Sequence, residues 1–125
     1  MSVEELKQDG VSQASKVLSF SEGAARRAAH ELLALLQVYD RLIALLRETD
    51  NDGLDMLTDG LVLSAVRCRA VLAQGGNDAG MQQMTSELRA GLREMPGTLR
   101  ALLPGLGPRL VESLQHKLGI QFLAY

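Results

Sequence analysis

The sequence predicts an all-α protein, a compact bundle of four to five helices with a long central helix over about residues 21–49. Two observations carry this prediction. Hydrophobic residues make up 46% of the chain and aromatic residues only 3%, so leucine and alanine must fill the core, which suits helices better than strands. The connections between the predicted helices are short, which favours antiparallel neighbours. We expect the 125 residues to form a single helical-bundle domain, 1–125.

The amino-terminal segment predicts a first helix that precedes the long one. Ser2-Val3-Glu4-Glu5 has the pattern of a capping box, in which each of two side chains accepts a hydrogen bond from the other residue's backbone amide. Gly10 weakens the middle of this helix by about 1 kcal/mol relative to alanine, which allows two short pieces. Ser19-Phe20-Ser21-Glu22 repeats the capping pattern and predicts the start of the long helix. The predicted inner side of the first helix consists of Val3, Leu6, Ala14, Val17 and Leu18.

The long helix has the clearest pattern in the chain. Apolar residues recur at alternating three- and four-residue steps, and a second apolar row lies beside this seam. The two rows together make a stripe so wide that we expect the helix to be covered on most of its surface. The seam consists of Ala25, Ala28, Leu32, Leu35, Tyr39, Leu42 and Leu46, the second row of Ala29, Leu33, Leu36 and Ile43, and the narrow polar face of Arg26, Arg27, Glu31, Gln37, Arg41 and Glu48.

The next predicted helix follows the turn-forming cluster Thr49-Asp50-Asn51-Asp52-Gly53 and stops at Gln74-Gly75-Gly76. Within it, Gly60 is interpreted as the site of a close helix crossing. Its predicted inner row consists of Leu54, Leu57, Leu61, Ala65, Cys68 and Leu72.

The carboxy-terminal third predicts two further helices with a short helical piece between them. Asn77 or Asp78 caps the first, and Pro96-Gly97 is expected to end it. Leu99, Leu102 and Leu103 suggest one or two further turns, and Pro108 suits the first turn of a last helix that ends at Gly119. The two inner rows consist of Met81, Met84, Leu88, Leu92 and Met95, and of Leu110, Val111, Leu114 and Leu118.

Two reactive side chains interrupt the apolar rows. Asp40 lies in the second row of the long helix, and because a buried unpaired carboxylate is costly, we expect an arginine from another helix or from a partner to pair with it. Cys68 is the only cysteine, so the chain forms no internal disulfide and no cysteine-based zinc site. We expect a buried thiol with a raised pKa, although Arg67 and Arg69 flank it.

Charge and hydropathy exclude several functional classes. The net charge of −2 lacks the positive excess that a protein binding nucleic acid on its own requires. The polar first ten residues do not resemble a signal peptide, and charged residues interrupt every apolar run before it could span a membrane. We therefore expect a cytoplasmic protein without a membrane segment.

We find no pattern that predicts catalysis or a metal site. Residues 48–59 partly resemble a calcium loop with Gly53 at the sixth position, but Asp55 stands where an apolar residue belongs and no second loop follows. His30 and His116 are far apart in sequence and lack carboxylates at metal-ligand spacing, so we expect structural roles for both. No nucleophile and base share a recognisable spacing. The expectation is a protein that is not an enzyme and has neither metal nor cofactor.

Three features favour a partner-binding role instead. Methionines share one face of a helix and could line an adaptable groove, although methionine more often fills gaps in the core. The apolar tail either folds back over the bundle or docks on a second chain. The paired arginines are solvated surface or meet an acidic patch. The candidate residues are Met81, Met84, Met95, Ile120, Phe122, Leu123, Tyr125, Arg26, Arg27, Arg67 and Arg69.

We therefore favour a small interaction protein, an adaptor, chaperone or inhibitor of another protein, which acts through apolar helix faces and the tail. Its leucine-rich seams also favour self-association as a symmetric dimer. One alternative is a helical subunit of a nucleoprotein complex that contacts nucleic acid through arginines. A further alternative is a bundle that binds an apolar ligand between its helices.

Overall fold

The structure, a computed structural model, confirms the all-α bundle. It describes the backbone of residues 3–75 and 78–125, and side chains from Gly23 onward apart from residues 76–78. Within these residues there are four α-helices, two 3-10 turns and no strand. The helices are α1 (Val3–Glu48), α2 (Asp55–Gln74), α3 (Asp78–Leu102) and α4 (Gly107–Leu118), and the turns are η1 (Asp52–Leu54) and η2 (Phe122–Ala124).

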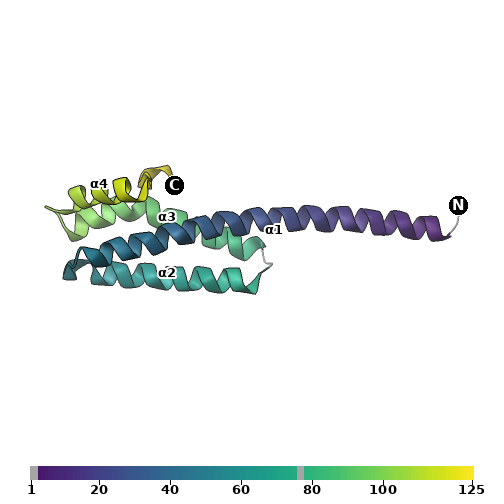
Figure 1. Ribbon diagram of the computed structural model, residues 1–125, viewed down its shortest axis with the longest axis horizontal. Coiled ribbons are helices and arrows are strands. Elements are labelled where there is room, and N and C mark those ends of the chain that lie inside the picture. Colours follow the sequence, from purple (N-terminus) through teal and green to yellow (C-terminus); the bar gives the residue numbers. More distant parts are fainter. Residues whose placement is uncertain (1–2, 76–77) are drawn as a thin grey trace.

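The helices lie side by side, with α1 and α3 between α2 and α4. α1 packs against α2, α3 and α4, whereas α2 packs mainly against α1 and α3, and η2 lies on α3. The α1–α2 turn and the α3–α4 connection lie at the same end of the bundle, and the purple first part of α1 extends past the other helices at the opposite end (Figure 1). α2 and α4 are therefore the two edge helices of the bundle.

The seam of α1 forms the centre of the core. Leu32, Tyr39 and Leu42 are at most 2% exposed, and the predicted polar face of this helix is exposed throughout. Burial of this one wide stripe against three neighbouring helices is the main contribution of α1 to folding. Arg41 adds a polar link, because its Nη2 donates a hydrogen bond of 2.8 Å to the backbone oxygen of Lys117 in α4.

The predicted break near residue 21 is wrong, because α1 is continuous from Val3 to Glu48. Residues 19–22 contain neither proline nor glycine, and the roughly 1 kcal/mol penalty of Gly10 does not end a helix. A capping residue satisfies free amides at a helix start but does not prevent a helix from continuing through it. Ser2 and the side chains of the predicted inner row Val3–Leu18 lie outside the described residues.

The connection into α2 is a short polar turn. The Asn51 side chain accepts a hydrogen bond of 2.9 Å from the Gly53 amide, and Asp50 has a left-handed backbone with φ of 49°. α2 then ends at Gly75, whose φ of 48° is the left-handed conformation that favours glycine. The predicted inner row lies on the core side, with Leu54, Leu61, Ala65 and Cys68 buried and Leu57 and Leu72 half-buried.

The close helix approach predicted at Gly60 is wrong, because no atom lies within 4 Å of where its Cβ would be. The close approach occurs at Gly91 of α3 instead. A Cβ there would lie 2.4 Å from Oη of Tyr39, whose hydroxyl donates a hydrogen bond of 2.7 Å to the Leu88 carbonyl. Gly91 thus makes room for the Tyr39 ring between α1 and α3.

The predicted end of α3 at Pro96-Gly97 is also wrong, since the helix continues to Leu102 with Pro96 inside it. An interior proline removes one backbone hydrogen bond and costs about 3 kcal/mol. Met95 and Leu99 on either side of it are 2% and 0% exposed, so packing offsets that cost. Asn77, one of two predicted capping residues, lies outside the described residues.

α4 and the tail close the structure as the sequence predicts. Pro108 lies in the first turn, the four residues of the predicted inner row are buried, and Gly119 ends the helix with φ of 66°. The Gly119 amide contacts the backbone oxygens of Gln115 and His116 in the last turn. The chain then reverses, which directs the tail back over α3.

Candidate interaction surfaces

The outer side of α2 is an apolar surface that no other element covers. Met56 is 88% exposed, Leu63 65% and Val66 55%, and the small residues Ala70 and Ala73 continue the same line. These positions are separated by seven, three, four and three residues, so they form one stripe along the side of the helix opposite Leu61 and Ala65 of the core. We call this stripe the α2 outward face; it consists of Met56, Leu63, Val66, Ala70 and Ala73.

The other edge helix differs sharply in character. The outer side of α4 presents Arg109, Glu112, His116 and Lys117, all exposed. A polar outer side is what an edge helix in water normally shows, and an apolar one marks a surface that associates. The α2 outward face was not predicted from the sequence, because a single inner row was assigned to that helix. The available signal was that Leu63 and Val66 fall outside that row, so α2 is apolar on two opposite sides.

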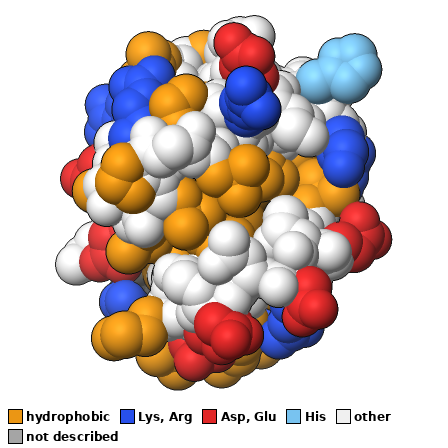
Figure 2. Space-filling view, turned by 90° about the vertical axis from the view of Figure 1, so that its left-hand side faces the viewer, with side chains coloured by type: hydrophobic (Ala, Val, Ile, Leu, Met, Phe, Trp, Pro, Cys, Tyr) orange, Lys and Arg blue, Asp and Glu red, His pale blue; other side chains and the backbone are white. Residues whose placement is uncertain are grey.

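A second apolar surface lies at the end of the bundle where both connections meet. Leu102 and Leu106 are 45% and 49% exposed, and Leu103 is half-buried. A Cβ atom on Gly53 would lie 3.4 Å from Cδ2 of Leu103, so this leucine packs against the α1–α2 turn. Figure 2 views this end and shows hydrophobic side chains at its centre with charged side chains around the border. We call Leu102, Leu103 and Leu106 the bundle-end patch.

Acidic side chains surround the α1–α2 turn beside this patch. Five acidic side chains at this end of the bundle are exposed: Glu48, Asp50, Asp52, Asp55 and Asp59. A hollow of about 300 Å³ lies among them, and it is lined by Leu46, Arg47, Asp50, Asn51, Asp55, Thr58 and Asp59. In the part of the chain described, no three side chains of His, Cys, Asp or Glu are grouped so that they could hold a metal ion. The acids instead give the hollow a negative potential suited to a cationic side chain.

The three methionines predicted to line a groove lie in the core. Met81, Met84 and Met95 are 3%, 3% and 2% exposed, respectively. They fill the space between α3 and its neighbours, which is the role that the sequence analysis left open beside the groove. They are not part of either apolar surface described above.

The tail folds back over the bundle, which was one of the two predicted alternatives. Phe122 is fully buried, Ile120 and Tyr125 are half-buried, and only Leu123 projects, at 77% exposure. Burial of one large aromatic ring anchors the whole segment, because such a side chain contributes up to about 3 kcal/mol. Of the four predicted tail residues, Leu123 alone remains available as an exposed contact.

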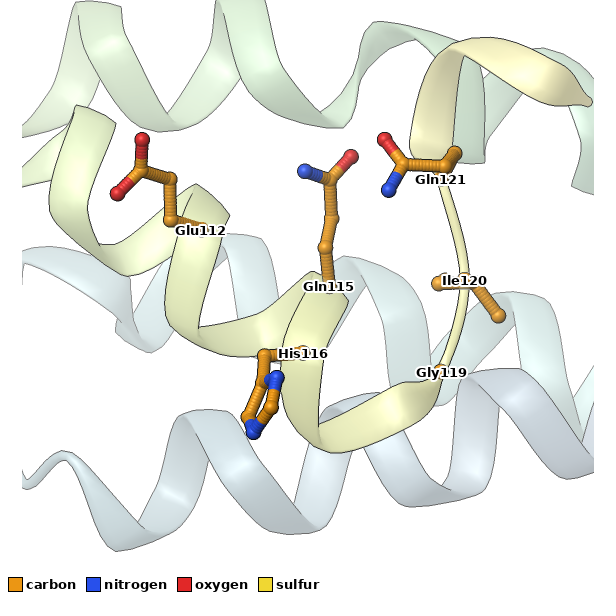
Figure 3. A pocket seen from close by; sticks show the side chains of 6 residues that line it. All are labelled: Glu112, Gln115, His116, Gly119, Ile120 and Gln121. Carbon is orange, nitrogen blue, oxygen red and sulfur yellow. The ribbon is translucent and has the colours of Figure 1, made fainter.

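A polar hollow of about 500 Å³ separates this tail from α4. It is lined by Glu112, Gln115, His116, Gly119, Ile120 and Gln121. Figure 3 shows Gln115 and Gln121 pointing toward one another across it, while His116 points away from the tail. The Gln115 side-chain oxygen accepts a hydrogen bond of 3.0 Å from the Phe122 amide. This hydrogen bond from α4 therefore helps to hold the tail in place at Phe122.

Two of the four predicted arginines form ion pairs within the chain. Arg69 approaches Asp40 to 2.5 Å and Arg67 approaches Glu87 to 3.2 Å. The first pair confirms the expectation that an arginine from another helix accompanies Asp40. All four of these side chains are 39% exposed or more, so neither pair contributes more than about 1 kcal/mol. Arg26 and Arg27 are exposed on α1.

Cys68 is fully buried, as predicted, and its Sγ lies 4.0 Å from the Leu32 carbonyl oxygen. Burial raises the pKa of this thiol; Asp40 adds to the increase and Arg69 opposes it. A thiol in this state is neutral and inert near neutral pH. Its position does not suit a nucleophile.

An apolar hollow of about 370 Å³ lies between α1 and the last turns of α2. It is lined by Arg26, Ala29, His30, Leu33 and Leu72. Leu33 is 43% exposed here, so the outer part of the predicted second row of α1 is open to solvent while Leu36 and Ile43 are buried. His30 is exposed at its border, whereas His116 lies in the last turn of α4, where positive charge is favourable.

Among the described residues, no helix is both long enough and apolar enough to cross a membrane. Comparison of the chain with known protein families, with curated proteins and with solved structures found no match.

Proposed function

We propose that the protein is a small protein–protein interaction module that binds a segment of another protein at the bundle end. The observation that carries this proposal is the bundle-end patch, an exposed apolar centre flanked by the acidic α1–α2 turn. An apolar centre with a charged border is the usual anatomy of a protein interface. An adaptor, a chaperone and an inhibitor would all use such a surface to cover part of their partner.

The side chains of this surface indicate which kind of partner segment would fit it. Leu102 and Leu106 would gain about 1–2 kcal/mol each on full burial, which requires an apolar side chain on the other protein. Asp55 and Asp59 at the neighbouring hollow favour lysine or arginine beside that apolar side chain. We therefore infer that the ligand is an amphipathic segment that is apolar on one side and basic at its edges. The charges speed the encounter and set the orientation, while the apolar contact supplies affinity.

A titration with synthetic peptides tests this proposal. A helical peptide of leucine and lysine should bind saturably, and a peptide of the same length and pattern with glutamate in place of lysine should not. Leu106→Asn should weaken binding about tenfold because it removes an apolar contact worth about 1.4 kcal/mol. Asp55→Lys should weaken peptide binding more at low salt than at high salt, since salt screens the charge contribution to binding.

Leu123→Asn is the matched control, because Leu123 is an exposed leucine on the tail, away from the patch. It should bind the leucine–lysine peptide as the unmodified chain does. Equal binding by Leu106→Asn and the unmodified chain, or equal affinity for the two peptides, would show that this end of the bundle does not recognise such a segment.

A second candidate function, binding of an amphiphilic anion, is favoured by the hollow between α1 and α2. Its walls are apolar at Ala29, Leu33 and Leu72, and Arg26 and His30 lie at its border, a combination that suits a carboxylate on an alkyl chain. Decanoate should raise the unfolding temperature of the unmodified chain more than that of Leu33→Asn. An equal shift for both proteins would exclude this hollow as the site.

A further inference from the structure

The α2 outward face is a long, straight apolar surface on the edge of the bundle. Met56, Leu63 and Val66 are each more than half exposed, and no described element of the chain packs over them. The positions 56, 59, 63, 66, 70 and 73 have the spacing of a seam on which another helix lies, and all of them are apolar except Asp59. A surface of this shape fits a helix, and the charges beside it indicate which helix.

The charges on α2 are divided between its two halves. Asp55 and Asp59 lie in the first two turns, whereas Arg67 and Arg69 lie in the second half, where exposed ion pairs join them to Glu87 and Asp40 of the neighbouring helices. A second α2 in the opposite direction would keep the two acidic halves apart and place each beside the half of the other helix that carries the two arginines. A second α2 in the same direction would bring Asp59 directly against another Asp59, which is unfavourable. Opposed helix dipoles also favour the antiparallel arrangement.

The sizes of the side chains agree with the same arrangement. In an antiparallel pair related by a two-fold axis between positions 63 and 66, Leu63 lies opposite the partner's Val66. Met56 then lies opposite the partner's Ala73, so that the largest side chain of the face meets the smallest one. Asp59 lies opposite the partner's Ala70, one helical turn from the partner's Arg67. Each contact is repeated by symmetry, which is how a two-fold interface is built.

We propose that two copies of this chain associate through their α2 outward faces, antiparallel, about a two-fold axis between Leu63 and Val66. The proposal goes beyond the binding function assigned to the bundle end, because the α2 outward face and the bundle-end patch have no residue in common. The dimer places its two bundle-end patches at opposite ends, so one dimer can hold two copies of its ligand.

Sedimentation equilibrium of the full chain tests the association. The unmodified protein should sediment at twice the chain mass, and Leu63→Glu and Val66→Lys should each sediment as monomers. Both residues are exposed, so circular dichroism should show unchanged helix content in the variants. Leu123→Glu, which places the same charge on an exposed apolar residue of the tail, should remain a dimer.

Disulfide cross-linking tests the direction of the helices. A mixture of Met56→Cys and Ala73→Cys chains should form a covalent heterodimer under mild oxidation, while neither variant alone should. In the antiparallel pair, identical positions lie about 25 Å apart along the helix axis, far beyond disulfide reach. The unmodified chain is the control, because its single thiol is fully buried.

Three outcomes would overturn the proposal. They are a monomeric unmodified chain, a Leu63→Glu protein that remains dimeric, and homodimeric cross-links of Met56→Cys alone, which indicate parallel helices. Each is distinguishable from failure at the bundle end, because the peptide titration uses Leu106 and Asp55 and can be repeated on the monomeric Leu63→Glu protein.

Discussion

At the scale of single residues, the contact between Tyr39 and Gly91 decides how closely α1 and α3 approach. The Tyr39 ring is 2% exposed and its hydroxyl is fixed by a hydrogen bond to the Leu88 carbonyl. A rigid ring held at both ends cannot move aside for an added methyl group. The sequence marked Tyr39 as a seam residue, but nothing in the spacing of glycines showed that Gly91 rather than Gly60 receives it.

Replacement of Gly91 by alanine should destabilise the protein. The new Cβ would lie 2.4 Å from the Tyr39 hydroxyl oxygen, and overpacking of this kind costs about 1–3 kcal/mol. Gly97→Ala in the same helix is the matched control, since no atom lies within 4 Å of its Cβ position. There alanine should gain up to about 1 kcal/mol through helix propensity. Urea unfolding measures both, and a stabilised Gly91→Ala protein would contradict the contact.

Stability should fall at alkaline pH because of Tyr39. Burial raises the pKa of its phenol, and the nearby Glu94 and Cys68 add to the increase. Since the folded state holds this proton more tightly than the unfolded state, the free energy of unfolding should decrease above about pH 10, where an unfolded tyrosine ionises. The decrease from this group should approach about 1.4 kcal/mol per pH unit.

Tyr39→Phe should remove this part of the decrease and also lose about 1 kcal/mol with the hydrogen bond to Leu88. Burial raises the pKa of Cys68 as well, so a decrease that begins near pH 8.5 should remain in the variant. Denaturant unfolding across this pH range measures the slopes, and equal slopes for Tyr39→Phe and the unmodified chain would refute the assignment.

At the scale of elements, the periodic rows and the helix ends at Gly75 and Gly119 were predictable, whereas the helix start near residue 21 and the helix end at Pro96 were predicted wrongly. The inner rows of α3 and α4 and the seam of α1 from Leu32 onward were assigned correctly because burial follows the helical repeat directly, whereas Leu33 of the second row of α1 is exposed. Pro96 was expected to end α3, yet the buried Met95 and Leu99 on either side stabilise the helix through it. Packing between helices decides such cases, and a single sequence does not display it.

The candidate surfaces were only partly predictable for the same reason. The tail was singled out by its composition, but its anchoring at Phe122 depends on the reversal at Gly119 and the Gln115 hydrogen bond. The α2 outward face was missed because α2 is apolar on two sides, and periodicity alone does not say which side meets the core. The bundle-end patch was not predicted because it lies against the α1–α2 turn, where Leu103 packs beside Gly53, and these two residues are distant in sequence.

The tail should contribute strongly to stability through one side chain. Phe122→Ala should cost about 3–5 kcal/mol, because it empties a fully buried site beneath η2. Leu123→Ala, at the neighbouring exposed position, should change stability by less than about 0.5 kcal/mol. Thermal or urea unfolding distinguishes the two. Similar small losses for both would mean that the tail is not held against α3.

At the scale of the whole molecule, the first part of α1 extends past the ends of α2 and α3, and the rest of α1 lies within the bundle (Figure 1). Among the residues whose side chains are described, the buried core is built from residues of all four helices between Leu32 and Phe122. The bundle is therefore expected to fold without the projecting segment.

Deletion of residues 1–22 should leave the bundle folded, with the midpoint of thermal unfolding unchanged within a few degrees. The total helical signal per chain should fall, because α1 loses its projecting turns. Circular dichroism with a thermal scan measures both quantities. A large drop in the midpoint would show that these residues pack on the bundle.

The chain contains no tryptophan and two tyrosines, one sealed in the core and one half-buried at the carboxyl end. Under ultraviolet excitation its emission therefore arises from those two rings alone. With Tyr125 replaced by phenylalanine, the remaining fluorophore sits between α1 and α3 with its hydroxyl bonded to a carbonyl. The fluorescence of Tyr39 can thus report whether α1 and α3 are packed together, without any attached dye.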